Sequence, residues 1–145
     1  MEAKVGVSVI LFNQLGQVLV GKRKGSHGAG MLSVPGGHLE FWETSSETCD
    51  RELLEEIGIN FKDQYKPLGF SEDFFDGKDN RKHYITLYFV VTNIDSDKIK
   101  IQNLEPHKCE SWNWIDTEDL TDSMFCDTYN KIKDYAKINY PIINI

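Results

Sequence analysis

The stretch that decides the fold is residues 37–59, GHLEFWETSSETCDRELLEEIGI. Thr44 and Glu47 have the spacing of a capping box, in which each side chain satisfies a backbone donor at the start of a helix. Gly58 suits the position that follows a helix, because glycine adopts a left-handed backbone there without strain. The sequence therefore predicts a helix that opens at Thr44 and closes at Gly58.

This helix is expected to bury one side and to carry acids beside it. At about 100° per residue an apolar stripe runs along one face, made of Cys49, Leu53 and Ile57. The adjoining side carries three carboxylates, those of Glu52, Glu55 and Glu56. Carboxylates three and four residues apart repel each other. A divalent cation such as Mg²⁺ relieves the repulsion, because it prefers oxygen ligands and is shared with substrate phosphates.

A solvated acidic surface is the alternative interpretation of any helix rich in glutamate. It leaves three neighbouring features unexplained: Arg51 among the acids, the Pro-Gly-Gly turn at residues 35–37, and Glu43 where the chain enters the helix. Together these features favour a metal-binding helix that follows a strand and a glycine turn.

The rest of the chain alternates between strand patterns and turns. Strands or extended segments are expected at residues 5–12, 18–20, 32–34, 38–41, 64–75, 82–92 and 109–115. Residues 13–16 favour a hairpin turn and residues 25–30 a glycine-rich loop. Residues 117–137 are expected to be helical in two pieces. This irregular mixture predicts an α/β fold with a mixed sheet in a single domain over residues 1–145.

Composition limits the classes of function. Lys and Arg number 16 against 23 Asp and Glu, a net charge of −7, which argues against a nucleic acid polymer or an anionic membrane as partner. No apolar run reaches the roughly 20 residues of a membrane-spanning helix, and the first residues show no signal peptide, so we expect a cytoplasmic protein. Cys49, Cys109 and Cys126 lie far apart, unlike a disulfide framework or a zinc site.

The residues already quoted resemble the Nudix box, G-x5-E-x7-R-E-U-x-E-E-x-G-U, where U is aliphatic. Every fixed position matches, through Gly37, Glu43, Arg51, Glu52, Leu53, Glu55, Glu56, Gly58 and Ile59. Residues 21–26, 28–30, 35–41, 103–106 and 110–114 are also similar to the MutT-type nucleoside-triphosphate diphosphatases, especially those acting on guanine-type and thiopurine nucleotides. The likeness fades in the C-terminal helix.

The resemblance implies an αβα sandwich with a strand–loop–helix catalytic motif. It implies hydrolysis of a nucleoside triphosphate to the monophosphate and pyrophosphate, in the service of nucleotide-pool sanitation, by a homodimer that uses Mg²⁺ or Mn²⁺. The implied metal ligands are Glu52, Glu55, Glu56 and the carbonyl of Gly36. Glu52 or Glu55 would accept the proton of the attacking water, and Arg51 would orient a carboxylate. Gly37, Glu43 and Gly58 would support the motif.

The resemblance also implies where the nucleotide binds, at Arg23, Gly37, Thr86, Phe125, Cys126 and Asp127. Three of these residues would also suit a role without ligand contact: Arg23 as a solvated charge at the end of a strand, Phe125 as helix core, and Asp127 as a helix cap. The sequence departs from its relatives here, since residues 126–129 replace a more apolar and basic pattern. Trp42 stands where relatives usually carry glycine.

Two further functions stay open. The same hydrolase fold would serve ADP-ribose, a dinucleoside polyphosphate, a capped RNA end or a pterin triphosphate, although the acidic charge argues against RNA. The other is a module that binds a nucleotide without hydrolysing it. Loss of a carboxylate from the Nudix box would favour this class, but all of these carboxylates are present.

Overall fold

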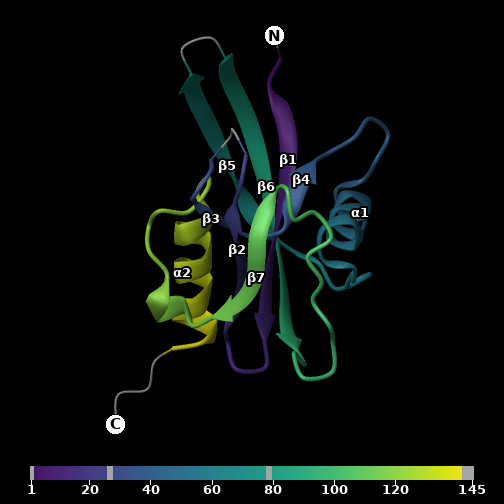
Figure 1. The fold of residues 1–145 in the computed structure, drawn as a ribbon, viewed down its shortest axis with the longest axis vertical. Helices are drawn as coiled ribbons and strands as arrows, with labels where there is room; N and C mark the ends of the chain where they lie inside the picture. Colours follow the sequence, from purple (N-terminus) through teal and green to yellow (C-terminus); the bar gives the residue numbers. More distant parts are fainter. Residues whose placement is uncertain (1, 26–27, 78–79, 142–145) are drawn as a thin grey trace.

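The computed structural model describes residues 2–25, 28–77 and 80–141; residues 26–27 of the expected glycine-rich loop lie outside them. Within these residues (Figure 1), the elements in chain order are β1 (Lys4–Asn13), β2 (Val18–Arg23), β3 (Leu32–Ser33), β4 (Gly36–His38), α1 (Ser45–Ile57), β5 (Lys66–Gly77), β6 (Asn80–Ile94), β7 (Cys109–Ile115), the short 3₁₀ helix η1 (Thr117–Asp119) and α2 (Thr128–Asn139).

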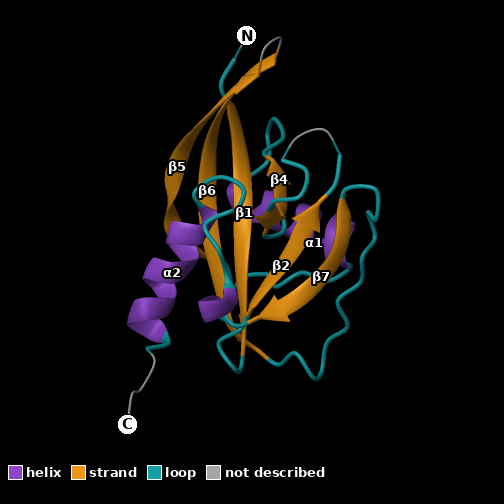
Figure 2. Ribbon diagram, turned by 60° about the vertical axis from the view of Figure 1, so that its left-hand side comes forward, coloured by secondary structure: helices purple, strands orange, loops and turns teal. Residues whose placement is uncertain are grey.

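The sheet forks along β1. Its strand order is β3-β2-β1-β6-β5, with β4 also paired to β1 and β7 to β2. β1 runs parallel to β6, with Lys4 opposite Tyr84. β2 pairs with β1 only next to the turn that joins them, where Phe12 lies opposite Val18. Further along β1, Gly6 pairs with His38 of β4 instead. The strands β2, β3 and β7 therefore diverge from β1, as Figure 2 shows.

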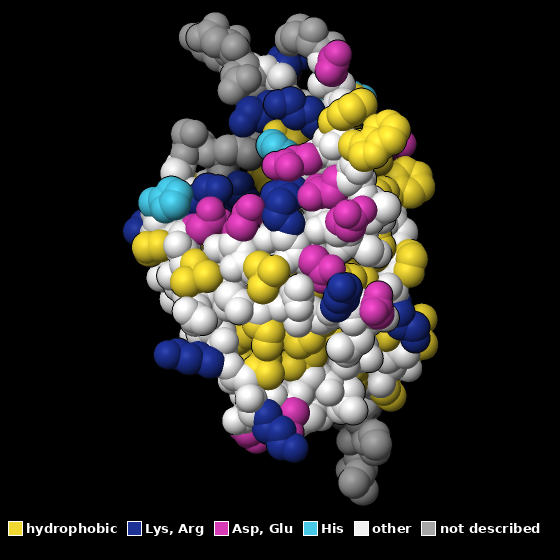
Figure 3. Space-filling model, turned by 90° about the vertical axis from the view of Figure 1, so that its right-hand side faces the viewer, with side chains coloured by type: hydrophobic (Ala, Val, Ile, Leu, Met, Phe, Trp, Pro, Cys, Tyr) yellow, Lys and Arg dark blue, Asp and Glu magenta, His cyan; other side chains and the backbone are white. Residues whose placement is uncertain are grey.

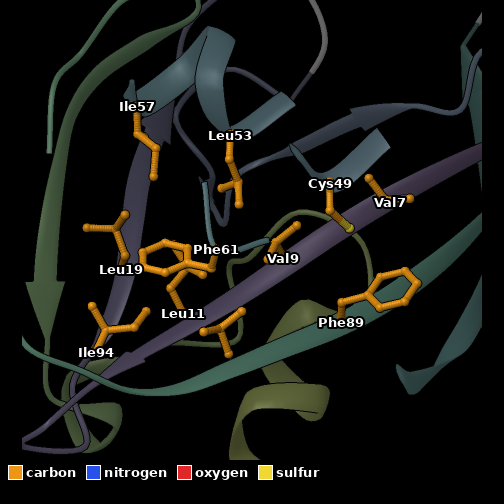
Figure 4. Close-up of a cluster of buried hydrophobic side chains, with 11 residues drawn as sticks. Val7, Val9, Leu11, Leu19, Cys49, Leu53, Ile57, Phe61, Phe89 and Ile94 are labelled. Atoms are coloured by element: carbon orange, nitrogen blue, oxygen red, sulfur yellow. The ribbon is translucent and has the colours of Figure 1, made fainter. Parts of the chain in front are cut away.

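The two helices cover opposite sides of this sheet (Figures 1 and 2). Alternate side chains of β1 pack under α1, with Val7, Val9 and Leu11 in one cluster with Cys49, Leu53 and Ile57 (Figure 4). The intervening β1 side chains, Ile10 and Phe12, pack with Ile132 of α2. The apolar stripe predicted for residues 49–57 is confirmed, and so is the αβα sandwich.

The helix α1 begins and ends where the sequence predicts. The Thr44 hydroxyl accepts a hydrogen bond from the Glu47 N–H, and the Glu47 carboxylate accepts one from the Thr44 N–H, each 3.1 Å long. Gly58 closes the helix at φ 78°, with its N–H donating to the Leu53 carbonyl. The two caps fix where α1 begins and ends, and this determines which helix face carries each of its acids.

The extended piece predicted at residues 38–41 was placed too late. β4 consists of Gly36–His38, and its glycines pair with β1. A Cβ at Gly36 would overlap the Val7 carbonyl oxygen, so only glycine allows this close pairing. After His38 the chain turns, and Trp42 adopts φ 71°, a left-handed backbone that costs a non-glycine residue about 1–2 kcal/mol.

Other expectations are confirmed in part. The faces predicted for residues 82–92 are correct: Phe89 and Val91 pack on the α1 side of β6, and Tyr88 and Val90 on the α2 side. The helical tail is shorter than predicted, since residues 120–127 separate η1 from α2. Cys49, Cys109 and Cys126 are free thiols. Across the described residues, every helix is too short or too polar to cross a membrane.

Candidate functional site

A cavity of about 600 Å³ opens where the sheet forks. Its walls come from β1, the ends of β2 and β3, β4, α1, β6 and the segment before α2. It brings together most of the residues predicted for the site, namely Arg23, Gly36, Gly37, Arg51, Glu52, Glu55, Glu56, Thr86, Phe125 and Cys126. The lining does not include Glu43, Gly58 or Asp127.

Arg51 ties the acids of this wall together. Its Nε and Nη2 donate to the two carboxylate oxygens of Glu43, at 2.8 and 3.0 Å. Its Nη1 donates to Glu52 Oε1 at 2.8 Å, and Nη2 also reaches the His38 carbonyl at 2.8 Å. The bonds from Arg51 lower the pKa of Glu43 to about 2. Glu43 therefore lies behind the acids of α1, bound to Arg51.

Glu56 lies deepest in the acidic wall. Burial raises the pKa of its carboxyl to about 8, although the Gly36 N–H donates to Glu56 Oε2 at 2.9 Å and favours the charged form. Burial likewise raises the pKa of Glu52, against the opposing effect of Arg51. Two buried carboxyls with raised pKa values are a costly arrangement that a bound cation would relieve.

Gly37 allows the strand β4 to approach these acids closely. A Cβ at this position would overlap the carboxylate of Glu52. The Glu52 carboxylate of α1 thus occupies the space that a side chain at residue 37 of β4 would need. The requirement for glycine at residue 37 is therefore steric.

The donor set fits a hard divalent cation. Glu52, Glu55, Glu56 and the Gly36 backbone face one cavity, and carboxylate and carbonyl oxygens are the ligands that such ions prefer. As the described side chains stand, no three acidic, histidine or cysteine groups converge on one point. Glu52 is engaged by Arg51 and Glu56 by Gly36, so a cation would compete with these two partners.

The far wall of the cavity is aromatic. Arg23 lies over the ring of Phe125, with the guanidinium carbon 3.9 Å from the ring centroid. On β5, Phe75 stacks on Phe125 at 5.4 Å and an interplanar angle of 9°. Phe125 lies outside α2, so the helix-core alternative was wrong. A base or sugar entering the cavity would meet the edge of this aromatic cluster and the guanidinium of Arg23.

A polar network that the sequence did not reveal lies behind this wall. Asp73 Oδ2 accepts hydrogen bonds from Thr86 at 2.7 Å and from Ser71 at 2.9 Å, and Ser71 also bonds the Tyr88 hydroxyl. Thr86 therefore commits its hydroxyl proton to Asp73 and can offer the cavity its lone pairs. Only the approximate position of β5 was predictable, because no motif marks Asp73 or Phe75.

Asp127 contributes differently from the expectation. Its carboxylate accepts a hydrogen bond from Asn130 at 2.8 Å, and its backbone N–H donates to Tyr88. It occupies the N-cap position of α2 without a side-chain bond to the helix backbone. Its carboxylate is thus bound by Asn130 of α2. The preceding residue, Cys126, lines the cavity and has a left-handed backbone with φ 61°.

Two lysines and a histidine complete the polar lining. Lys24 and Lys108 also line the cavity, and their charges would suit phosphates. His38 stacks on Tyr84, and its Nε2 lies 3.2 Å from the Tyr84 hydroxyl. Burial and then the charge of Lys4 lower the pKa of His38. Both effects favour the neutral imidazole.

Comparisons with known proteins agree with this geometry. The chain is 27% identical to the RNA pyrophosphohydrolase of Gluconacetobacter diazotrophicus, over 93% of this chain and 92% of that one. A MutT NUDIX hydrolase from Burkholderia pseudomallei has the same fold, with a TM-score of 0.79 at 22% identity, covering 92% of this chain and 98% of that one.

A second solved structure is a bifunctional NMN adenylyltransferase/ADP ribose pyrophosphatase from Francisella tularensis, complexed with AMP and a Mn ion. Its TM-score is 0.70 at 22% identity, and the match covers 95% of this chain and 42% of that one. These likenesses show a shared fold. The family model described as the NUDIX domain matches residues 2–136. The chain therefore belongs to the Nudix hydrolases, a family that generally uses divalent metals to act on phosphoanhydride bonds of nucleotide derivatives.

Proposed function

We propose that the protein hydrolyses a nucleoside triphosphate to the monophosphate and pyrophosphate, with Mg²⁺ as its metal and Mn²⁺ as a substitute. The carrying observation is the position of the Glu56 and Glu52 carboxyls beneath the glycines of β4, where burial raises the pKa of both and a bound cation would stabilise their charged forms. A cation also reconciles an acidic protein with an anionic substrate.

The side chains of α1 divide the chemistry between them. Glu52, Glu55 and Glu56, with the Gly36 carbonyl, hold the metal, which when bound neutralises phosphate charge and acidifies water. Glu52 or Glu55 takes the proton of the attacking water. Water oxygen bonds to phosphorus as the bridging P–O bond breaks, and pyrophosphate leaves. Arg51 keeps Glu52 aimed into the cavity.

The opposite wall holds the nucleoside. Arg23 and Phe75 lie against Phe125, so an entering base would contact the edge of this aromatic cluster and the guanidinium of Arg23. Thr86 and Cys126 lie where a base edge would be read. The two walls face each other across one cavity, so a nucleotide bound between them would place its phosphates beside the acids.

Pyrophosphate release across a panel of triphosphates tests this proposal. The panel contains oxidised, methylated and standard bases, together with ADP-ribose as a diphosphate control. We expect Mg²⁺-dependent release of pyrophosphate from at least one triphosphate and its loss in Glu56→Gln. Turnover confined to ADP-ribose would replace the triphosphate proposal, and no turnover of any nucleotide would support a binding module instead.

We also propose that the protein is a cytoplasmic homodimer whose residues 1–145 make one domain. The dimer is tested by light scattering at micromolar concentration, where a mass of twice 16.7 kDa is expected. A monomeric mass would contradict it.

A further inference from the structure

The turn between β4 and α1 carries two aromatic side chains that stand in solvent. Phe41 is 94% exposed and Trp42 is 91% exposed, with ring centroids 5.8 Å apart. The φ of 71° at Trp42 lies in the left-handed region, which bulky residues rarely adopt. Because this ring buries little and its backbone is strained, the stability of the fold does not account for a tryptophan here.

The turn itself is firmly held. The Leu39 N–H donates to the Val5 carbonyl at 2.9 Å, and the Glu43 N–H to the Glu40 carbonyl at 3.1 Å. The Glu40 N–H donates to Glu43 Oε1, and that carboxylate is in turn bound by Arg51. The two rings therefore stand on a base that is continuous with the catalytic machinery. A platform fixed in advance loses little entropy when it binds a ligand.

The two rings line a hollow of about 510 Å³ that adjoins the catalytic cavity. His38 and Glu40 line both spaces, so one leads into the other. Figure 3 shows hydrophobic side chains next to a patch of mixed acidic and basic ones on this side of the molecule. Lys4 also lines the hollow. A phosphate chain that extends past His38 would thus meet a positive charge and then the aromatic rings.

We propose that Phe41 and Trp42 stack the second base of a dinucleoside polyphosphate whose first base lies against Phe125. This inference rests on the proposed phosphoanhydride chemistry and adds a substrate class to it. One water is consumed: its oxygen bonds to a phosphorus, the bridging P–O bond breaks, and its proton passes through a carboxylate to solvent. Two nucleotides leave as the products.

The composition of the hollow favours a nucleotide over a second copy of the chain. Besides the two rings, four of its lining residues are polar or charged, namely Lys4, His38, Glu40 and Glu43, and three are apolar, namely Ala3, Val5 and Leu39. Charged residues are depleted in the centre of protein interfaces, which bury about 800 Å² per partner. A base that stacks on aromatic rings while its phosphates meet a lysine tolerates such surroundings.

The decisive experiment compares two substrates in matched variants. The value of kcat/KM is measured for a dinucleoside tetraphosphate and for the triphosphate of the same base. We expect Trp42→Gly and Phe41→Ala to lose about tenfold on the dinucleotide and to keep the triphosphate rate. Trp42→Phe should retain most of the dinucleotide rate. Ile138→Ala, which removes an equally exposed apolar side chain on α2, is the control.

Two further measurements separate binding from folding. Trp42→Gly should unfold at the same or a higher temperature than the parent, because glycine relieves the strained φ. In Glu56→Gln, the dinucleotide should quench a component of tryptophan emission that disappears when Trp42→Phe is added. Absence of that component would show that Trp42 does not stack a base of the dinucleotide.

The remaining outcomes are distinguishable. If Trp42→Gly lowers kcat/KM equally for both substrates, or lowers it for neither, the two rings do not stack a second base. The proposed function would still stand. Hydrolysis of neither substrate by the parent would overturn both. Conversion of a dimer to a monomer by Trp42→Gly, with unchanged dinucleotide kinetics, would show that the rings contact a second copy instead.

Discussion

Arg51 grips Glu43 through two parallel hydrogen bonds, from Nε at 2.8 Å and from Nη2 at 3.0 Å. The pair is mostly buried, and it aims the third nitrogen of the guanidinium at Glu52. A planar fork of donors is needed for this, which lysine lacks. The acid at the entrance of the helix and the arginine within it therefore act as one unit that positions Glu52.

This unit should give the protein a characteristic acid sensitivity. The pKa of Glu43 is about 2 in the folded state against an ordinary value of 4.5, so its stabilisation is complete above pH 4.5 and is lost as the pH falls toward 2. Urea unfolding from pH 6 to pH 2 should show a shallower loss of stability in Glu43→Gln than in the parent. Glu72→Gln, at an exposed position of β5, is the control, and equal slopes would contradict the assignment.

Replacing Glu56 by glutamine should separate catalysis from stability. The amide oxygen still accepts from the Gly36 N–H, but an amide cannot ionise to give the metal a negatively charged ligand, so kcat should fall on the order of 100-fold while the unfolding temperature in EDTA stays level or rises. Steady-state kinetics in a Mg²⁺ titration measure the first effect. Normal turnover at saturating Mg²⁺ would remove Glu56 from the metal site; Glu118→Gln on η1 is the matched control.

Gly37→Ala should damage the site more than the fold. The added Cβ would overlap the Glu52 carboxylate and turn it away from the cavity, so we expect weaker Mg²⁺ binding by calorimetry and a lower kcat. Gly6→Ala provides the comparison, because its Cβ would meet only the Gly37 carbonyl oxygen at 3.4 Å. Similar kinetics in the two variants would show that contact with Glu52 is unimportant.

Phe125→Ala should weaken nucleotide binding. Loss of the ring between Arg23 and Phe75 removes the contact that holds both side chains in the cavity wall, so KM should rise about tenfold, or about 1.4 kcal/mol of binding free energy, while kcat changes little. Phe74→Ala removes a neighbouring ring that is 69% exposed and should leave KM unchanged. An unaltered KM in Phe125→Ala would place the base elsewhere.

The sequence was most informative where interactions are local. Thr44, Glu47 and Gly58 determine the ends of α1 through bonds within a few residues of each other, so the helix and its acidic side were predictable. β4 was misplaced because Gly36 and Gly37 were interpreted as a turn. Their strand conformation depends on pairing with β1, a contact between segments far apart in the chain.

The aromatic wall illustrates the same limit. Phe125 was a candidate, yet its partner Phe75 comes from β5, and nothing near either residue indicates the stack. Asp73 was missed for the same reason, since its bond to Thr86 crosses between antiparallel strands. The strain at Trp42 is also a property of the folded turn, although its replacement of the usual glycine drew attention to it.

The parallel pairing of β1 with β6 has a consequence for biosynthesis. Lys4 lies opposite Tyr84, so a chain emerging from the ribosome has made its first strand long before that strand's neighbour exists. During that interval Ile10, Leu11 and Phe12, each fully buried in the finished protein, have no layer to cover them. Nascent chains halted before β6 should therefore depend on chaperones and aggregate without them.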